Sequence, residues 1–280
     1  MQIIPFNAPL GAEITGIDLA ADLAEDTIKE LNGYWAKHSV LCFRNQTLSA
    51  PDFLRAGRIF GEPFEQIYGQ FNHPDYPDIG LLTHKDGDTA GNGKRKIRGT
   101  SWHTDASYFE CPPSGTMLYA LITPEGGGDT DFMSTRAAYE ALSDKMKKRI
   151  DKLEAFHVYE SSRSPRKLIK RSQDQVEKFG DQTKHPIVRT HPSNGCKSIF
   201  LNPIRVESIV GLGRHESDNI LDDLHDHMFK PEFHYRHKWS NGDFLIWDNR
   251  SVLHQANDDY DWRKQERKLY RIMVKGEKPF

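Results

Sequence analysis

Apolar residues recur at helical spacing in several parts of the chain. Leu23, Ile28, Leu31 and Trp35 fall on one face of a predicted helix. Ser49-Ala-Pro-Asp52 begins another, because a polar cap followed by proline suits a first turn. The predicted helices cover residues 21–38, 49–61, 134–153 (two short helices capped by Ser134 and Ser143) and 217–229.

Strand patterns dominate the rest of the chain. A Pro192-Ser-Asn-Gly195 turn lies between two short apolar runs and predicts a hairpin. The predicted strands cover residues 39–43, 116–122, 186–190, 197–201, 244–247, 251–254 and 268–274. Helices and strands do not alternate regularly, so the pattern predicts a β-sandwich or barrel with helices outside it. There is no repeat and no linker, and we expect one domain over residues 1–280.

Composition and charge exclude several classes of protein. The 280 residues carry 38 Lys+Arg and 40 Asp+Glu, and this net charge of −2 does not suit a general nucleic-acid binder. No stretch approaches the roughly 20 apolar residues of a membrane-spanning helix, and the first residues do not resemble a signal peptide. Cys42, Cys111 and Cys196 show no metal-ligand spacing and are expected to be free thiols of the cytoplasm.

Three His-X-Asp triplets are candidate metal ligands. In a strand, residues i and i+2 point to the same side and can share one ion. With 13 histidines in the chain such triplets also arise by chance, so the neighbouring residues have to show which triplet could bind a metal. His73-Pro-Asp75 lies in a proline-rich stretch and His84-Lys-Asp86 leads into a polar loop, whereas His103-Thr-Asp105 is flanked by aromatic residues. The last triplet is therefore the strongest candidate, against the alternative of a solvated loop histidine.

A third ligand has to come from elsewhere in the chain. His254 ends an apolar strand just after Trp247, which could bring it inside a barrel. Two histidines and one carboxylate form the facial triad of non-haem Fe(II) oxygenases, although zinc hydrolases use similar ligands. The residues alone leave other candidates open: His157, His185, His191, His215, His225, His227, His234 and His237. Of these, the group at 215–227 is expected to lie on a solvated helix surface.

An ordered set of motifs resembles the taurine dioxygenase (TauD/TfdA) family of Fe(II)- and 2-oxoglutarate-dependent enzymes. The similarity covers nearly the whole chain. Its segments are Gly11–Leu19, Val40–Ser49, Trp102-His-Thr-Asp105, Gly126-Gly-Gly-Asp-Thr130, Trp247-Asp-Asn-Arg250, Leu253-His-Gln-Ala256 and Arg267-X-X-X-Arg271. The resemblance implies a double-stranded β-helix (jelly-roll, cupin-like) core. It also implies an oxidoreductase that uses Fe(II), 2-oxoglutarate and O2 and releases succinate and CO2.

The same resemblance assigns residues by position. His103, Asp105 and His254 would bind the iron, and Thr130 and Arg267 the distal carboxylate of 2-oxoglutarate. Arg271 would meet an anionic group of the substrate, and His73 and Tyr76 could line the substrate pocket. Without the motifs, Arg267 and Arg271 would be interpreted as part of a solvated run of charges, and the glycines at 126–128 as a plain flexible turn. A dimer or tetramer is expected by analogy with the family.

The substrate is the least determined part of this prediction. Taurine enzymes of the family carry an asparagine four residues before the first metal histidine, and here that position is Gly99. The basic segment 88–99 resembles an active-site lid and favours a small anion such as a sulfonate, aryloxyalkanoate, alkyl sulfate or phosphonate. A zinc-dependent hydrolase and a non-catalytic anion-binding protein on the same barrel are the alternatives.

Overall fold

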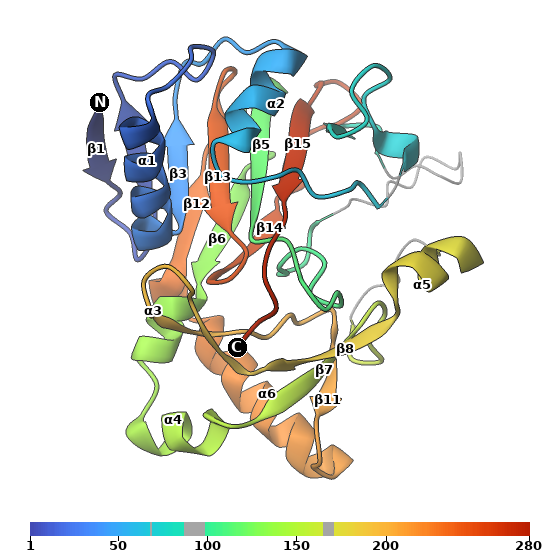
Figure 1. Cartoon of the computed structure of the whole chain (residues 1–280). Helices are drawn as coiled ribbons and strands as arrows, with labels where there is room; N and C mark the ends of the chain where they lie inside the picture. The colour runs from blue at the N-terminus through green and yellow to red at the C-terminus, as the bar shows by residue number, and fades with distance from the viewer. Residues whose placement is uncertain (68, 87–98, 165–170) are drawn as a thin grey trace.

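Two facing β-sheets form the upper part of the molecule, and a mixed α/β layer lies below them (Figure 1). The structure, a computed structural model, describes residues 1–67, 69–86, 99–164 and 171–280. Residues 88–98 of the expected lid lie outside these ranges.

The larger sheet has seven strands. All neighbours in it are antiparallel except β2 and β3, which are parallel. In spatial order the strands are β1 (Gln2–Pro5), β2 (Ala12–Thr15), β3 (Val40–Phe43), β13 (Phe244–Asp248), β5 (Gly115–Ile122), β15 (Lys268–Val274) and β4 (Gly80–Thr83).

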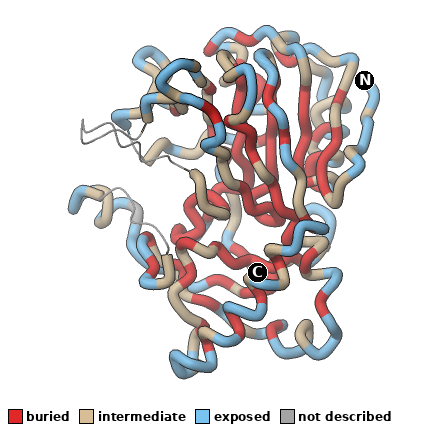
Figure 2. The backbone as a smooth tube through the Cα atoms, turned by 180° about the vertical axis from the view of Figure 1, so that it is seen from behind, coloured by how far each residue is buried: buried red, intermediate tan, exposed pale blue. Residues whose placement is uncertain are grey.

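The smaller sheet faces the larger one and consists of β12 (His234–His237), β6 (Thr130–Ser134) and β14 (Val252–Ala256). Between the sheets lies an apolar layer to which β6 contributes Phe132 and β14 contributes Val252. From the larger sheet it includes Leu118, Leu245 and Trp247. Figure 2 shows these strands as largely buried. The predicted β core with a jelly-roll arrangement and outer helices is confirmed.

Helices α1 (Glu25–His38) and α2 (Ala50–Arg58) cover the outer face of the larger sheet. Leu31 and Trp35 of α1 and Phe53 of α2 pack there against side chains such as Met117. Ser49 caps α2 through a reciprocal capping box with Asp52, as its sequence predicts. Burial on both faces explains why the central strands read as continuous apolar runs.

The lower layer has its own apolar core. Its strands are β7 (Glu154–Val158), β8 (Gln182–Pro186) and β11 (Val206–Ile209), with the predicted hairpin of β9 (Val188–Thr190) and β10 (Lys197–Ile199) beside them. Its helices are α3 (Thr135–Glu140), α4 (Asp144–Ile150), α5 (Gln173–Phe179) and α6 (Arg214–Met228). Two 3-10 turns, η1 (Gly69–Phe71) and η2 (Pro231–Phe233), complete the described elements. Ser134 and Ser143 cap α3 and α4 as predicted.

The predicted boundaries of two helices were wrong. Helix α1 begins at Glu25 rather than at residue 21, where the chain still forms turns. Helix α6 begins at Arg214, before Ser217, with Gly213 at its N-cap. The Ser217 hydroxyl is buried and accepts a hydrogen bond from the amide of Ile209 on β11. The residue at which the helix was predicted to begin therefore lies inside it, and its hydroxyl makes a tertiary contact.

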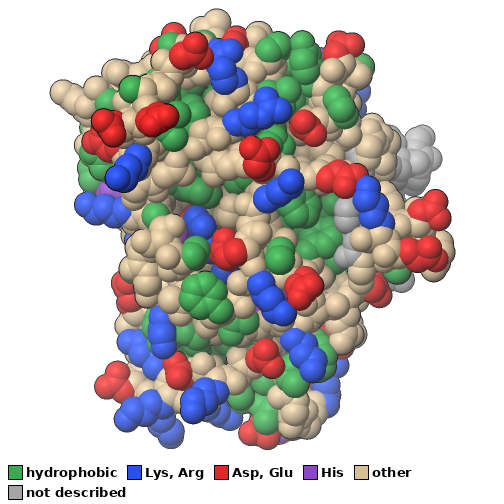
Figure 3. Space-filling view, viewed as in Figure 1, with side chains coloured by type: hydrophobic (Ala, Val, Ile, Leu, Met, Phe, Trp, Pro, Cys, Tyr) green, Lys and Arg blue, Asp and Glu red, His purple; other side chains and the backbone are tan. Residues whose placement is uncertain are grey.

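Acidic and basic side chains are interspersed over the face seen in Figure 3. This mixture agrees with the near-zero net charge of the chain. None of the described helices is both long enough and apolar enough to span a membrane.

Candidate metal centre

Two histidines are held side by side by backbone pairing at the β14 edge of the smaller sheet. The His103 amide donates to the His254 carbonyl at 3.0 Å, and the His254 amide donates to the His103 carbonyl at 2.8 Å. Their ring centroids lie 4.2 Å apart. Residues 151 positions apart in sequence therefore present two imidazoles to one place. Trp247, 4.6 Å from the His254 ring, forms an apolar wall behind it.

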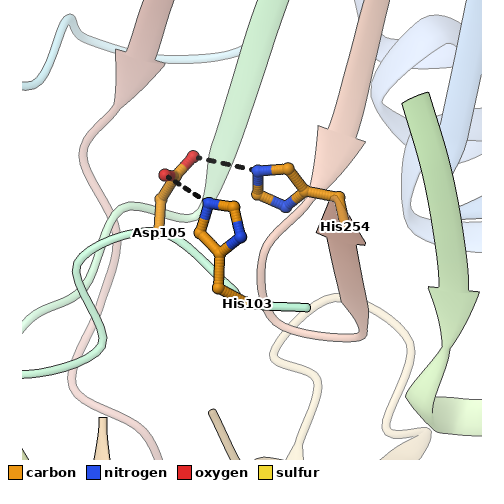
Figure 4. A group of neighbouring side chains, drawn as sticks. All are labelled: His103, Asp105 and His254. Carbon is orange, nitrogen blue, oxygen red and sulfur yellow. Dashed lines mark ion pairs between the residues drawn. The ribbon is translucent and has the colours of Figure 1, made fainter. Parts of the chain in front are cut away.

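Asp105 faces both imidazoles (Figure 4). Its two carboxylate oxygens lie 3.9 Å from Nε2 of His103 and 3.9 Å from Nε2 of His254. One ligand atom from each residue falls within 4.8 Å of the others, and among the described residues no other group has this property. Two nitrogens and one carboxylate oxygen on one side of a common point suit a divalent transition metal with open positions.

Further contacts hold the Asp105 carboxylate in its ionised form. Burial favours the protonated acid, but the positive charge of Arg271, helped by the hydrogen bond from Thr116, opposes it, and the pKa lies well below its usual range. Nη2 of Arg271 lies 2.8 Å from Oδ1. The Thr116 hydroxyl donates to Oδ2 at 2.6 Å. The carboxylate is thus both ionised and fixed in orientation.

The two histidines have the form that a metal requires. Nδ1 of His103 lies 2.7 Å from the Ser101 carbonyl oxygen, which places the proton on Nδ1 and the lone pair on Nε2. Burial, and then the neighbouring His103, lower the pKa of His254 well below its usual value, so its imidazole is neutral at pH 7. Neutral imidazole is the ligand form, and the donor set fits Fe(II).

A buried chain of hydrogen bonds extends behind Asp105. The Asn249 side-chain amide donates to Oγ1 of Thr116 at 2.9 Å, and the Thr116 hydroxyl in turn donates a hydrogen bond to Asp105. The Thr104 hydroxyl donates to the Asn249 carbonyl at 2.9 Å. Sequence reasoning assigned no role to Thr116 or Asn249. The only signal was the Trp247-Asp-Asn-Arg250 motif, which contains Asn249.

The glycine-rich turn at residues 126–128 lies beside Thr130 and Arg267, the two residues predicted to bind 2-oxoglutarate. Nε of Arg267 donates to the Gly128 carbonyl at 3.1 Å, and Thr130, two residues further on, begins β6. The buried Thr130 hydroxyl accepts from Nε1 of Trp239 at 3.0 Å, which leaves its own proton for a ligand carboxylate. Arg267 lies just before β15, and Arg271 lies within it.

The turn is not a plain flexible one, because Gly127 has φ +78° and lies against residue 259. A Cβ at Gly127 would stand 2.4 Å from the Asp259 carbonyl oxygen, whereas one at Gly126 would meet nothing within 4 Å. We expect Gly127→Ala to lower the free energy of unfolding by at least the ~1–2 kcal/mol of a left-handed residue, and Gly126→Ala to leave it nearly unchanged. Denaturant unfolding of both variants measures this difference, and equal effects would contradict it.

A cavity beside Asp105 includes Arg271 but neither His73 nor Tyr76 among its walls. The His73 ring packs against Tyr76 and Tyr270. Tyr270 belongs to the outer core under α2, the opposite face of β15 from Arg271. The structure therefore does not bring His73 and Tyr76 to the cavity, and we do not place them in the substrate site.

The other two His-X-Asp triplets have local structural contacts. Asp86 accepts from the Thr83 amide and hydroxyl at the end of β4, and the Asp75 amide donates to Nδ1 of His73. His225 and His227 are half-buried and stack on Phe229 and Phe233, so the expected solvated surface there was only partly right. His157 and His185 pack on Phe200, His191 and His237 contact aspartates, and His234 packs on Trp102.

Comparison with known proteins gives one consistent family. The family model described as "Taurine catabolism dioxygenase TauD, TfdA family" matches residues 2–273.

Individual relatives agree with this match. An alpha-ketoglutarate-dependent sulfonate dioxygenase of Saccharomyces cerevisiae is 34% identical, over 100% of this chain and 68% of its own length. An alpha-ketoglutarate-dependent sulfate ester dioxygenase of Pseudomonas putida is 32% identical, over 100% of this chain and 91% of its own. The crystal structure of a taurine dioxygenase from Burkholderia xenovorans superposes with a TM-score of 0.82 at 29% identity, covering 99% of this chain and 92% of that one.

Proposed function

Because this chain belongs to the TauD/TfdA family, we propose that His103, Asp105 and His254 bind its Fe(II). The protein is an Fe(II)- and 2-oxoglutarate-dependent dioxygenase. Iron and 2-oxoglutarate supply, with O2, the oxidising power that hydroxylates a C–H bond, and succinate and CO2 are released. The observation that carries the assignment is the convergence of two imidazoles and one carboxylate within 4.8 Å. The comparisons give no support to a zinc-dependent hydrolase or a non-catalytic anion-binding protein.

We assign the distal carboxylate of 2-oxoglutarate to Thr130 and Arg267. A planar guanidinium suits bidentate pairing with a carboxylate, and the Thr130 hydroxyl has a proton to donate. The Gly128 carbonyl accepts from Nε of Arg267 and so orients the guanidinium that would pair with the ligand. The apolar layer between the sheets, which contains Leu118 and Leu269, would exclude water from the co-substrate.

We assign the anionic group of the substrate to Arg271. This arginine lines the cavity beside Asp105 and so lies next to the proposed iron. The relatives named above act on sulfonates and sulfate esters, and a guanidinium suits either anion. Gly99 supports a substrate other than taurine. This position lies close to the His103 ring, and a glycine has no side chain with which to bind the amino group of taurine.

Substitutions of the two arginines should affect different kinetic constants. We expect Arg267→Ala to raise the KM for 2-oxoglutarate, and Arg271→Ala to raise the KM for the anionic substrate, each by roughly 10- to 100-fold. Each substitution should change the KM for the other ligand by less than about threefold, because the two guanidiniums contact different parts of the site. Succinate release measured while each ligand is varied tests this split. The reverse pattern would mean that the two assignments are exchanged.

A cytoplasmic location and a homo-oligomeric state are also proposed. The three cysteines are unpaired and Cys111 is exposed, as is usual in a reducing compartment. A dimer or tetramer follows only from analogy with the family, and sedimentation of the purified chain would test it.

A further inference from the structure

Asp105 is held differently from the two histidines beside it. Backbone pairing fixes His103 and His254 to each other, whereas Asp105 lies in the turn that follows His103 (Figure 4). The next residue, Ala106, takes φ +47°, a left-handed conformation that is unfavourable for alanine. The place of this third side chain therefore depends on what its carboxylate contacts.

Thr116 supplies such a contact from a central strand of the larger sheet. It lies in β5, where it pairs with Trp247 of β13 on one side and with Met273 of β15 on the other. Its side chain is buried, and its hydroxyl donates to Oδ2 of Asp105 at 2.6 Å. A hydrogen bond to an ionised acceptor is about twice as strong as one between neutral groups. The hydroxyl can therefore hold the carboxylate in a single orientation.

Asn249 sets the direction of this hydrogen bond. Its Nδ2 donates to Oγ1 of Thr116 at 2.9 Å, so the single hydroxyl proton of Thr116 points to Asp105. Its own Oδ1 is buried, and no group of the described residues donates to it. An amide turned the other way would place this acceptor against Thr116, where it would compete with Asp105 for the proton. The observed orientation thus leaves one buried acceptor unsatisfied and keeps the donor on Asp105.

Other hydrogen bonds fix the turn itself. The Thr104 hydroxyl donates to the Asn249 carbonyl at 2.9 Å. The Asn202 side chain donates to the Thr104 carbonyl at 2.7 Å and to the Ser107 hydroxyl at 2.9 Å. These bonds hold the backbone on either side of Asp105. The turn therefore does not depend on the hydrogen bond that the Asp105 carboxylate accepts.

We propose that Thr116 and Asn249 are positioning residues of the metal centre. Asn249 directs the Thr116 hydroxyl, and the hydroxyl holds Oδ2 of Asp105, so the carboxylate meets the metal in one preset orientation. A metal binds more tightly to a ligand that is already ordered by the groups behind it. This inference rests on the proposed function, because it takes Asp105 as a ligand of Fe(II).

Two substitutions at Thr116 test the hydroxyl. Thr116→Val removes it and keeps the shape of the side chain. We expect the Kd for Fe(II), measured by calorimetric titration under nitrogen, to rise by roughly 10- to 100-fold, the usual effect of losing a group behind a ligand. Thr116→Ser keeps the hydroxyl, and its Kd should stay within about threefold of the native value.

A double variant separates positioning from stability. Thr116→Val alone leaves the Asn249 amide without its acceptor in the interior, and this destabilises the fold. Asn249→Leu replaces the amide by an apolar group of similar shape, so Thr116→Val combined with Asn249→Leu should regain part of the lost Tm. Its Kd for Fe(II) should nevertheless stay within about threefold of that of Thr116→Val, because Asn249 acts through the missing hydroxyl.

Ser217 provides a control for the loss of a buried hydroxyl. It lies on α6, outside the metal-capable group, and its hydroxyl accepts from the Ile209 amide at 2.8 Å. Ser217→Ala should lower the Tm and leave the Kd for Fe(II) unchanged. If Ser217→Ala weakened Fe(II) binding as much as Thr116→Val does, metal affinity would merely follow stability and the inference would be overturned.

The remaining outcomes separate this inference from the proposed function. If Thr116→Val binds Fe(II) as tightly as the native chain, or if the double variant regains affinity together with its Tm, the two residues are only structural and the inference is wrong. If Thr116→Val does not fold, the double variant takes its place in the comparison with Thr116→Ser. If the native chain binds no Fe(II), Asp105 is not a ligand, and the proposed function fails together with this inference.

Discussion

Replacing His254 with alanine should abolish Fe(II) binding and succinate release. The variant keeps His103 and Asp105 but loses one of the three converging side chains, and no fourth residue of the described part of the chain belongs to this group. We expect the loss to exceed the roughly 10- to 100-fold that follows removal of a group behind a ligand. Bound iron after anaerobic loading and succinate release from 2-oxoglutarate are the two measurements.

His215 gives the control for this substitution. It is an exposed histidine on α6, outside the metal-capable group. His215→Ala should bind iron and release succinate like the native chain. If His254→Ala retained more than about a tenth of the native activity, His254 would not be a ligand and the facial triad would have to be rebuilt.

Replacing Asp248 with asparagine has the largest expected effect on stability. Asp248 lies at the end of β13, fully buried, and accepts from Nε and Nη2 of Arg250, both at 2.7 Å. Nε2 of His191 lies 2.9 Å from the same carboxylate. Removing the charge leaves Arg250 without its buried partner, and loss of one member of such a pair costs about 3–5 kcal/mol. Because β13 leads into β14, the position of His254 depends on this anchor.

The effect of Asp248→Asn should depend on pH. Burial would raise the Asp248 pKa, but Arg250 and His191 outweigh it and hold the pKa well below its usual range. The ionised carboxylate thus stabilises the fold above the ordinary aspartate pKa of about 3.9, and this contribution is lost as pH falls below it. The gap between native and variant unfolding free energies should be widest near pH 7 and should narrow below pH 4. Asp151→Asn, at the half-exposed pair with Lys197, should change stability far less.

The sequence was sufficient to predict most strands and the three side chains that converge at the candidate metal centre, for physical reasons. Buried strands leave unbroken apolar runs, and the serines at 49, 134 and 143 satisfy helix ends by purely local hydrogen bonds. His103 and Asp105 are close in sequence, so their pairing was visible as a motif. His254 was singled out by the apolar strand that was predicted to end at it, and then by the family resemblance.

The rest of the site depends on contacts between distant segments. Thr116 is an ordinary strand residue until the fold brings its hydroxyl to Asp105. In the sequence Arg205 looks like a surface charge. Only the structure shows that its guanidinium lies over Tyr108 and Tyr159 and lines the cavity beside Asp105. Ala106 takes φ +47° directly after Asp105, a conformation that no residue-type preference would predict for alanine. His73 and Tyr76 are not among the described walls of the cavity beside Asp105, and their local motif does not reveal which face of the sheet they pack on.

Anaerobic titration of the native chain with Fe(II) and then 2-oxoglutarate tests the central claim most directly. If His103, Asp105 and His254 form an open iron site next to Thr130 and Arg267, 2-oxoglutarate chelates the iron and a metal-to-ligand charge-transfer band appears and saturates. The same titration of His254→Ala gives no such band. Absence of the band in the native chain, or an unchanged band in His254→Ala, would contradict the account.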